Sequence, residues 1–592
     1  MSRVALILSL LVCFGPLSKV AAQKKPPTTV SSLCTRDYAI DTSKQQIIVS
    51  RTLDNAVQRI AVLLRTADLL WPHEQDKALA AFTEAFDLAV QNFKEHGDQT
   101  RRASEKRFSA TIALPDQRFK VITALAKYDP ARAQKWSEQM LQETVQDPAA
   151  APQDKTRTAE KLLQVANHLV TTDPMAALSF ARQSLRYPAS MFLTLFLYEL
   201  SKANKQLADR FYTDALAAYA KTPMVQFLYL SAYPFGNSRD AGEMPTFTRY
   251  QIPEGYVPSP ALQQAFMQVL LARVEGVLGT KVEITSSHYP EDHLQMWYAL
   301  TRLEKQVQAE LPDLADATVR STEKLLAVLG RGLQEQLTGR IEADNKPREP
   351  FDVRVEAAEK SSNVERRDEM LVSAIIGASS KEESVDKVLS VIDKISDSNI
   401  RGPLLNWFYY FRAQAMISEK NLSEARRFAS KVTELDQRAY LFTRIAEESL
   451  KVTEDQTEAR ELLNEIAESV SKAPKTIVSA RALLALAHLY AKFDMIRGIE
   501  ELGNAVRIIN TLEAPDFSQE VVLMKIEGRK FGRYAEFSTP GFNPENAFRE
   551  MGKLDFDGSM VQATLFTDKS LRALTTLAVI EPCFATKSTK NK

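Results

Sequence analysis

The chain has little glycine, balanced charge and no long apolar run beyond its first residues, and each shortage excludes a class of protein. Glycine accounts for 19 of 592 residues, against about 7% on average, which excludes collagen-like chains and disfavours turn-dense all-β folds. Lys and Arg total 75, as do Asp and Glu, so no basic field predicts nucleic-acid binding. No later segment approaches 18 uninterrupted apolar residues, so we expect a soluble mature chain without a transmembrane segment.

The first residues have the pattern of a secretory signal. Arg3 precedes an apolar run over residues 4–17, and small residues follow, with Val20 and Ala22 at the positions that signal peptidases favour. The run is too short to span a membrane comfortably, and Pro16 lies within it, which disfavours an uncleaved anchor. We therefore expect residues 1–22 to be a signal peptide and the protein to be exported, to the periplasm or the exterior.

Cysteine is scarce, and its positions leave one pairing open. Removal of the signal takes Cys13 and leaves Cys34 and Cys583, one near each end of the chain. An even count in an oxidising compartment is compatible with a disulfide. A bridge requires Cα atoms within about 7 Å of each other, and the ends of an open solenoid lie far apart. We therefore expect two unpaired thiols, with a Cys34–Cys583 bridge as the minority hypothesis.

Helical periodicity dominates the sequence after residue 51. Apolar residues recur at i, i+3, i+4 and i+7, and sustained strand-like alternation is scarce. Residues 54–70 and 74–94 illustrate the unit, two amphipathic helices separated at Pro72. Such a pair cannot bury its apolar faces alone and needs a stacked neighbour, which is the property of a solenoid.

Small and aromatic residues repeat at helical spacing. Ala78, Phe82 and Ala85 have the same spacing as Ala208, Tyr212 and Ala215, and Ala425 lies 34 residues before Ala459. In these features the chain resembles the tetratricopeptide repeat family, with degenerate repeats. The resemblance implies an all-α solenoid of antiparallel helix pairs over most of residues 51–526, and it implies no particular ligand. An irregular all-α bundle is the alternative.

Aspartates mark several helix starts. Asp129 and Asp173 each precede a proline, as an N-cap before the first helical position. Asp116, Asp436 and Asp568 precede apolar helical stretches in similar contexts, and we interpret them as recurrent helix starts favoured by the helix dipole.

Breaks in the helical pattern predict the organisation of the chain. We expect a signal peptide over residues 1–22, an irregular lead-in over 23–50, a helical-repeat region over 51–339, a hinge over 340–351, a second, tetratricopeptide-like region over 352–526 and a C-terminal cap over 527–592.

The longest break, at residues 232–260, is rich in proline and aromatic residues. It cannot form one helix, and its aromatic content favours an ordered insertion. Either its rings bind a peptide or sugar, or they fill the groove between helices and cap them. Candidate partner-binding residues, including aromatics of a later helix face, are Tyr233, Phe235, Arg239, Phe247, Arg249, Tyr250, Tyr256, Trp407, Phe408, Tyr409 and Tyr410.

Motifs for catalysis and cofactor binding are missing from the sequence. It contains no phosphate-binding loop, no His-Glu-x2-His and no Gly-x-Ser-x-Gly, so we expect no cofactor and name no catalytic residue. His288, Glu291 and His293 form the one weak candidate for a metal site. Pro290 before two acidic residues is better explained as a helix start.

These features favour an exported, non-enzymatic scaffold that binds a protein, peptide or envelope partner on a concave surface. The alternative is an all-α toroid enzyme acting on polysaccharide or peptidoglycan, with catalytic carboxylates that sequence spacing does not show. A structural subunit of a surface complex is a third option. The sequence leaves the oligomeric state open.

Overall fold

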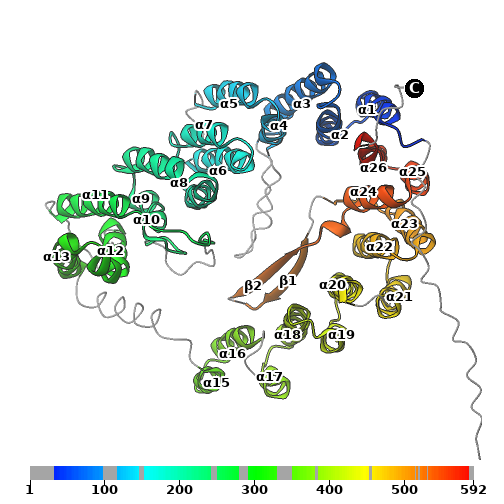
Figure 1. The fold of residues 1–592 in the computed structure, drawn as a ribbon. Helices are drawn as coiled ribbons and strands as arrows, with labels where there is room; N and C mark the ends of the chain where they lie inside the picture. Colours follow the sequence, from blue (N-terminus) through cyan, green and yellow to red (C-terminus); the bar gives the residue numbers. More distant parts are fainter. Residues whose placement is uncertain are drawn as a thin grey trace, which may run out of the picture.

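The computed structural model describes residues 33–97, 116–145, 152–241, 250–278, 291–329, 350–379, 384–452, 456–513, 515–517, 521–529 and 531–585. These residues form helices that follow one another around a ring, with the first and last helices side by side and with the stretch between α13 and α15 outside the described residues (Figure 1). The prediction of an all-α solenoid of antiparallel helix pairs is confirmed, and the ring is its closed form.

The first half of the ring contains α1 to α13. Their bounds are α1 Arg36–Ser50, α2 Ala56–Leu70, α3 Gln75–His96, α4 Gln117–Ala126, α5 Pro130–Val145, α6 Pro152–Leu169, α7 Pro174–Ser184, α8 Met191–Tyr219, α9 Met224–Leu228, α10 Ala232–Phe235, α11 Pro260–Leu278, α12 Glu291–Glu310 and α13 Pro312–Leu329.

The second half contains α15 to α26, a β-hairpin and two short 3-10 turns. Their bounds are α15 Phe351–Glu359, α16 Val364–Ala378, α17 Val385–Ile392, α18 Ser398–Ser418, α19 Leu422–Ala429, α20 Leu435–Val452, α21 Thr457–Lys472, α22 Ile477–Tyr490, α23 Met495–Ile509, β1 Val521–Glu527, β2 Gly532–Ser538, η1 Pro540–Phe542, α24 Pro544–Leu554, α25 Phe556–Thr564, α26 Lys569–Ile580 and η2 Glu581–Ala585.

Small residues let paired helices approach closely, as the repeat spacing predicts. Ala78, Ala425 and Ala459 are completely buried. At Gly498 of α23, an added Cβ would lie 3.0 Å from the carbonyl oxygen of Ala487 in α22. The backbones of this pair therefore touch, and no side chain fits between them.

Ion pairs repeat between neighbouring units of the second half. Lys387 binds Asp352 at 2.7 Å, Arg426 binds Glu461 at 3.4 Å, and Arg460 binds Asp494 at 2.5 Å. The partners are 34 or 35 residues apart in sequence. Equivalent surface positions of successive units thus face each other, which is the arrangement expected of a repeat with a period near 34 residues.

Several predicted helix starts are confirmed. The side chains of Asp116, Asp173 and Asp568 each accept a hydrogen bond from a backbone N–H in the first turn of α4, α7 and α26. Asp129 accepts one from Arg132. Asp436 differs slightly, because α20 begins one residue earlier and Asp436 lies within its first turn.

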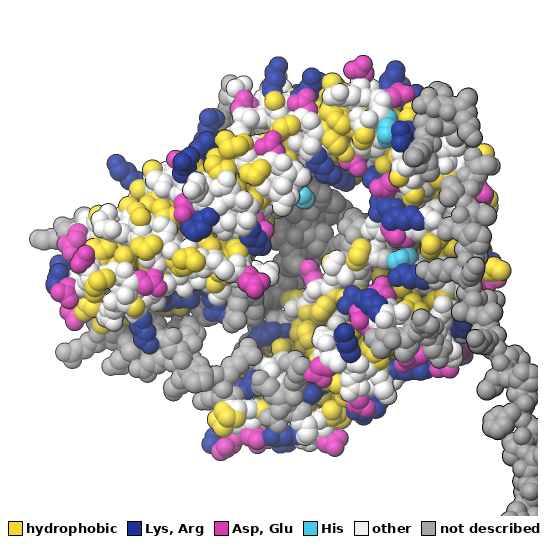
Figure 2. Space-filling view, in the orientation of Figure 1, with side chains coloured by type: hydrophobic (Ala, Val, Ile, Leu, Met, Phe, Trp, Pro, Cys, Tyr) yellow, Lys and Arg dark blue, Asp and Glu magenta, His cyan; other side chains and the backbone are white. Residues whose placement is uncertain are grey.

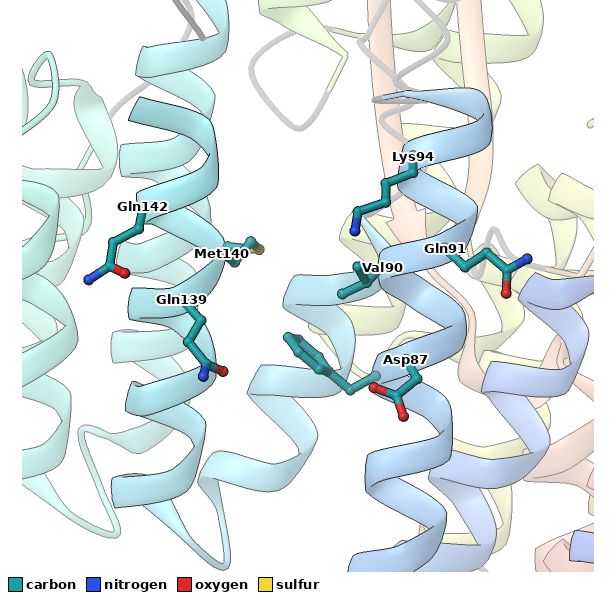
Figure 3. Close-up of a pocket in the computed structure, with 8 residues that line it drawn as sticks. Asp87, Val90, Gln91, Lys94, Gln139, Met140 and Gln142 are labelled. Atoms are coloured by element: carbon teal, nitrogen blue, oxygen red, sulfur yellow. The ribbon is translucent and has the colours of Figure 1, made fainter. Parts of the chain in front are cut away.

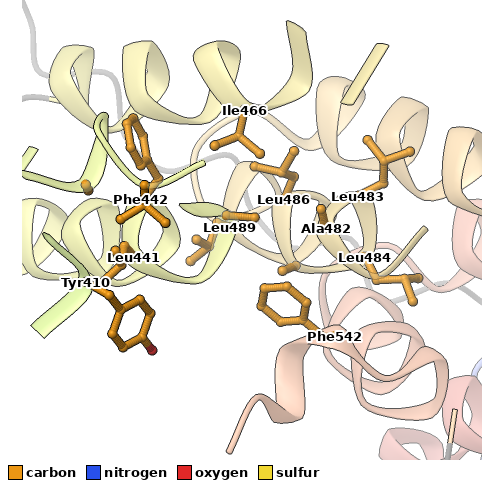
Figure 4. Close-up of a cluster of buried hydrophobic side chains, with 14 of the residues drawn as sticks. Tyr410, Leu441, Phe442, Ile466, Ala482, Leu483, Leu484, Leu486, Leu489 and Phe542 are labelled. Carbon is orange, nitrogen blue, oxygen red and sulfur yellow. The ribbon is translucent and has the colours of Figure 1, made fainter. Parts of the chain in front are cut away.

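Two hydrophobic cores divide the ring, and α2 belongs to both. Ile60, Leu63 and Leu70 pack into the core of the first half. Val62 and Leu69, on the same helix, pack with Cys34 and α26 in the core of the second half. Part of that second core, from Tyr410 to Phe542, is shown in Figure 4. Helix α2 thus joins the beginning of the chain to its end.

The predicted irregular lead-in over residues 23–50 is wrong for residues 36–50, which form α1. Thr35 caps this helix by accepting a hydrogen bond from the N–H of Tyr38. The side of α1 that is buried carries Ala39, Ser43, Gln46 and Ser50. Because these residues are small or polar, the helix has no apolar periodicity, and the sequence pattern does not show it. Residues 23–32 lie outside the described residues.

The expected separation of the two chain ends is also wrong. Cys34 and Cys583 form a disulfide, with their Cα atoms 5.1 Å apart. The prediction of two unpaired thiols assumed an open solenoid. The closed ring instead places α1 against α26 and η2.

The β-hairpin was not expected either. Strands β1 and β2 pair in antiparallel fashion, with Val521 opposite Ser538 and Glu527 opposite Gly532. Strand β1 thus lies at the end of the predicted second helical region, and strand β2 lies in the predicted C-terminal cap. The hairpin lies inside the ring (Figure 1), with β1 against α18 and α20. Most of the predicted hinge, residues 340–349, lies outside the described residues.

Candidate functional site

The structure buries most of the aromatic residues that the sequence singles out in the 232–260 insertion. Tyr233, Phe235 and Tyr250 are at most 4% exposed. Tyr256 and Arg239 are half-buried. Phe247 and Arg249 lie outside the described residues. Of the two interpretations of this insertion, the burial agrees with rings that fill the groove between helices.

Hydrogen bonds hold these rings in place. The Tyr233 hydroxyl donates to Asp209 of α8 at 2.8 Å, and the Tyr256 hydroxyl donates to the Tyr233 carbonyl at 2.6 Å. The Tyr198 hydroxyl donates to the carbonyl of Ala232 at 2.8 Å. Burial raises the pKa of all three tyrosines above the ordinary value. The described part of the insertion therefore packs beside α8 and is hydrogen-bonded to that helix.

The aromatic residues of α18 are buried as well. Trp407, Phe408, Tyr409 and Tyr410 are all at most 8% exposed. Tyr410 lies 4.7 Å, ring to ring, from Phe537 of β2. These side chains anchor the hairpin, and in this structure they offer almost no surface to a partner.

The candidate metal residues do not come together as a described site. His293 is buried, and burial lowers its pKa. His288 and the side chain of Glu291 lie outside the described part of the chain. Within the described ranges, no group of three or more His, Cys, Asp or Glu side chains could hold a metal ion.

The seam that closes the ring carries the densest set of contacts between distant segments. Beside the Cys34–Cys583 bridge, the Arg36 guanidinium donates to the carbonyl of Phe584 at 3.2 Å. The rings of His73 and Phe584 stack at 5.1 Å. These contacts join the first helices to η2 without the disulfide.

Charged side chains continue this seam between α2, α24 and η2. Glu581 accepts hydrogen bonds from both Arg65 and Arg549. Arg65 also binds Asp68 at 3.4 Å and lies 4.0 Å from Glu545. Because these carboxylates face guanidinium groups from α2 and α24, the cluster holds the first helices to the last ones beside the disulfide.

A groove lies between α3 and α5 in the first half of the ring (Figure 3). Its volume is about 710 Å³. Phe86 of α3 lines it and stacks on Trp136 of α5, with ring centres 4.5 Å apart and planes 12° apart. Val90 and Lys94 of α3 face α5 across the groove (Figure 3). The remaining lining residues are Asp87, Gln91, Gln139, Met140 and Gln142.

The groove has an apolar floor and polar margins. Phe86 and Met140 are at most 9% exposed, whereas Asp87, Lys94 and Gln139 are exposed. Sequence reasoning missed these residues because an exposed Gln, Lys or Asp on an amphipathic helix looks like an ordinary solvated face. The stacking of Phe86 on Trp136 is set by tertiary packing and has no sequence signal.

A second cavity, of about 830 Å³, lies between the hairpin tip and the first turns of α16 and α18. Acidic residues line it, and four of them have partners. Glu365 binds Arg529 at 3.2 Å, Asp368 accepts from the N–H groups of Ser396 and Asp397, Asp397 caps α18, and Glu527 accepts from Tyr534. These carboxylates hold helix ends and the hairpin tip, so the cavity does not favour the enzyme alternative.

Charges of both signs are spread over the visible face of the ring (Figure 2). None of the helices in the described ranges is long and apolar enough to cross a membrane.

Comparison with known proteins identifies no family. No protein-family model matches the chain, and no curated protein matches it in sequence. Three solved structures show weak similarity. A homology model of the full-length AP-3 complex in an intermediate open conformation has 11% identity and a TM-score of 0.19, with 88% of this chain and 78% of that chain covered.

The second is a circular tandem repeat protein with novel repeat topology, with 12% identity, a TM-score of 0.16 and coverage of 91% of this chain and 96% of that one. The third is a human IFIT1 dimer with PPP-AAAA, with 12% identity, a TM-score of 0.17 and coverage of 80% and 98%. Similarity at this level assigns no function to the chain.

Proposed function

We propose that this protein is an exported, non-enzymatic scaffold that binds a polypeptide partner in the groove between α3 and α5. The observation that carries the proposal is the groove itself, where Phe86, held in place by stacking on Trp136, lies between polar margins. A helical-repeat ring offers large surfaces of this kind and needs no cofactor to use them.

Export is supported by two independent features. The first 22 residues have the pattern of a secretory signal, and the Cys34–Cys583 bridge is of a kind that persists in oxidising compartments. A reducing cytosol would leave the same cysteines as thiols. The bridge and the signal thus agree on an extracytoplasmic location.

The chemistry of the groove defines the partner that it would accept. Val90, which is half-buried above the buried Phe86 and Met140, offers the apolar contact, which suits an aliphatic or aromatic side chain of the partner. Lys94 stands beside them with no ion-pair partner among the described residues, so an acidic residue of the partner would complement it. The expected partner segment therefore combines an apolar anchor with a carboxylate.

Site-specific crosslinking tests this proposal. A photoreactive amino acid at Gln139, in the groove, should crosslink a partner from the fraction to which the protein is exported. The same group at Lys135, exposed on α5 but outside the groove lining, is the matched control. Val90→Arg should fill the groove and abolish the Gln139 crosslink. The same crosslinked partner from Val90→Arg would contradict the proposal.

A further inference from the structure

Strand β2 has an outer edge without a strand partner. Among the described residues the sheet contains two strands, and β1 is the neighbour of β2 on one side. Strand β1 lies against α18 and α20, while the hairpin as a whole lies within the ring (Figure 1). Among the described residues, no strand pairs with the outer edge of β2, and the Arg533 side chain bonds only its first carbonyl, that of Gly532, at 3.1 Å.

The hydrogen-bond pattern shows which backbone groups this edge presents. The carbonyl of Leu523 in β1 accepts a hydrogen bond from the Gln437 side chain at 3.2 Å, so this carbonyl points away from β2. Residues directly opposite in an antiparallel pair share this orientation, and Glu536 is opposite Leu523. The N–H and C=O groups of Glu536 therefore point outward from the sheet.

The hydrogen bond of the turn independently gives the same alternation of inward-facing and outward-facing backbone groups. The N–H of Gly528 donates to the carbonyl of Phe531 at 2.9 Å, so these two residues bond to each other across the hairpin. Alternation along the strands then turns the backbone groups of Tyr534, Glu536 and Ser538 outward. No backbone hydrogen bond is formed by these outward groups among the described residues.

Two other features make this edge suited to pairing. It has no proline or bulge within Gly532–Ser538, and the charged side chains on it are Arg533 and Glu536. Buried polar contacts also hold the hairpin in place, because Gln437 bonds to both Asn406 of α18 and Leu523 of β1. The edge is thus fixed before any ligand arrives, which lowers the entropy cost of binding.

We propose that the outer edge of β2 binds an extended segment of a partner protein as a third strand. Side chains of that segment would alternate between the two faces of the sheet. On one face they would meet Ala535 and Phe537, which are half-buried and continue to Phe411 at 5.7 Å, ring to ring, from Phe537. On the other they would meet Glu536.

Charge complementarity defines the segment further. Glu536 is exposed and has no ion-pair partner among the described residues, whereas nearby Lys525 and Glu527 neutralise each other at 2.5 Å. The expected ligand therefore alternates apolar residues with basic ones. It differs from the acidic ligand of the α3–α5 groove, so this inference goes beyond the proposed function and the two can fail separately.

A designed peptide tests the proposal on the full mature chain. The probe is acetyl-Thr-Lys-Val-Lys-Val-Lys-Thr-amide, and its control carries N-methyl groups on alternate residues, which remove the N–H donors of one edge. Binding is measured by fluorescence anisotropy at 150 mM salt, which reduces non-specific attraction. We expect at least tenfold weaker binding of the methylated peptide that lacks donors toward β2.

Proline variants on the two edges of the hairpin are the matched pair. Glu536→Pro removes an outward N–H of β2 without removing a bond to β1, and Val521→Pro does the same on the other edge of the sheet without changing its charge. Glu536→Pro should weaken peptide binding at least tenfold, and Val521→Pro should leave it unchanged. Circular dichroism and thermal unfolding check that both variants are folded.

Hydrogen exchange separates strand addition from other modes of binding. The amides of Tyr534 and Glu536 should exchange at least tenfold more slowly with the peptide, while those of Ala535 and Phe537 should be protected in both states. Equal binding by Glu536→Pro, no binding by the parent chain, or a concentration-dependent dimer that excludes the peptide would each overturn the proposal. In any of these cases the Gln139 crosslink would still report separately on the α3–α5 groove.

Discussion

Cys34 and Cys583 are 549 positions apart in the sequence, and their Cα atoms are 5.1 Å apart in the structure. The bridge joins Cys34, two residues before α1, to η2, and Cys583 is completely buried. It therefore closes a ring of stacked helices at the point where its two ends meet. A solenoid closed in this way has no free terminal repeat to cap.

Replacing Cys583 with Ala should weaken the ring mainly through its unfolded state. The bridge closes a loop with a sequence separation of 549, to which the chain-entropy relation assigns about 6 kcal/mol, as an upper value. Denaturant titration followed by tryptophan fluorescence should show a lower midpoint for Cys583→Ala. Reductant should lower the parent midpoint by the same amount.

The folded shape of that variant should be unchanged. The Arg36–Phe584 hydrogen bond and the His73–Phe584 stack still hold the seam. Small-angle scattering of the parent and of Cys583→Ala should therefore superimpose. A larger radius of gyration for the variant would show that the disulfide alone keeps the ring closed.

Substitution of two glycines should change stability in opposite directions, because Gly498 lies where α22 packs closely on α23 and Gly402 lies in open space on α18. Gly498→Val would place side-chain atoms against the backbone of Ala487 and Ala491, which an added Cβ would already approach to 3.0 Å. We expect a loss of about 2 kcal/mol or more. Gly402, in α18, has open space around an added Cβ, so Gly402→Ala should leave stability unchanged or raise it by up to about 1 kcal/mol.

Thermal unfolding of the two variants beside the parent measures this contrast. Equal midpoints for Gly498→Val and the parent would show that the two helices have room to separate. That result would contradict the close approach on which the repeat assignment in the second half depends.

His488 of α22 should make the ring less stable as the pH falls. Burial, with Lys492 nearby, lowers its pKa to about 4 from 6.5. Between these values the unfolded chain takes up a proton that the folded chain does not, so the free energy of unfolding decreases as the pH falls from 7 toward 4. By linkage, the titration of His488 lowers the free energy of unfolding at pH 5 by about 2 kcal/mol relative to neutral pH.

His488→Gln removes this contribution. The stability of the variant should fall less steeply than that of the parent between pH 7 and pH 5, as measured by denaturant titration at each pH. Parallel curves for the two proteins would show that His488 titrates normally in the folded state.

Gln437 should control the position of the hairpin. Its amide donates to the carbonyl of Leu523 and accepts from Asn406, and all of these groups lie between α18, α20 and β1. Gln437→Leu leaves the buried Asn406 amide without this partner, at a cost of about 1–3 kcal/mol, and removes the partly buried bond to the Leu523 carbonyl. Hydrogen exchange should become faster at Met524 and Ile526 and stay unchanged in α2, which is distant from the hairpin.

Sequence patterns predict the parts of the fold that depend on local rules. The apolar stripe of α2 and the small residues Ala425 and Ala459 indicate paired helices, and Asp173 marks a helix start, because each reflects contacts within one unit or with the next unit. Periodicity also misses α1, whose buried side is small and polar.

Features that depend on the whole ring have no local signal. Closure is the sum of many small rotations between units, so no single residue reveals that Cys34 meets Cys583. The burial of Tyr233 and Tyr410 has the same origin, since an aromatic residue in a break or on a helix face has the same sequence signature whether it fills a core or faces solvent. The groove beside Phe86 likewise arises from the spacing of two helices that are not consecutive.

The central claim is that a disulfide between Cys34 and Cys583 joins the first and last helices in the exported protein. Digestion of the exported protein with thiols blocked and no reductant, followed by mass spectrometry, tests it directly. The ring predicts one crosslinked pair of peptides containing Cys34 and Cys583, which separates on reduction. Recovery of both cysteines as blocked free thiols would contradict the account.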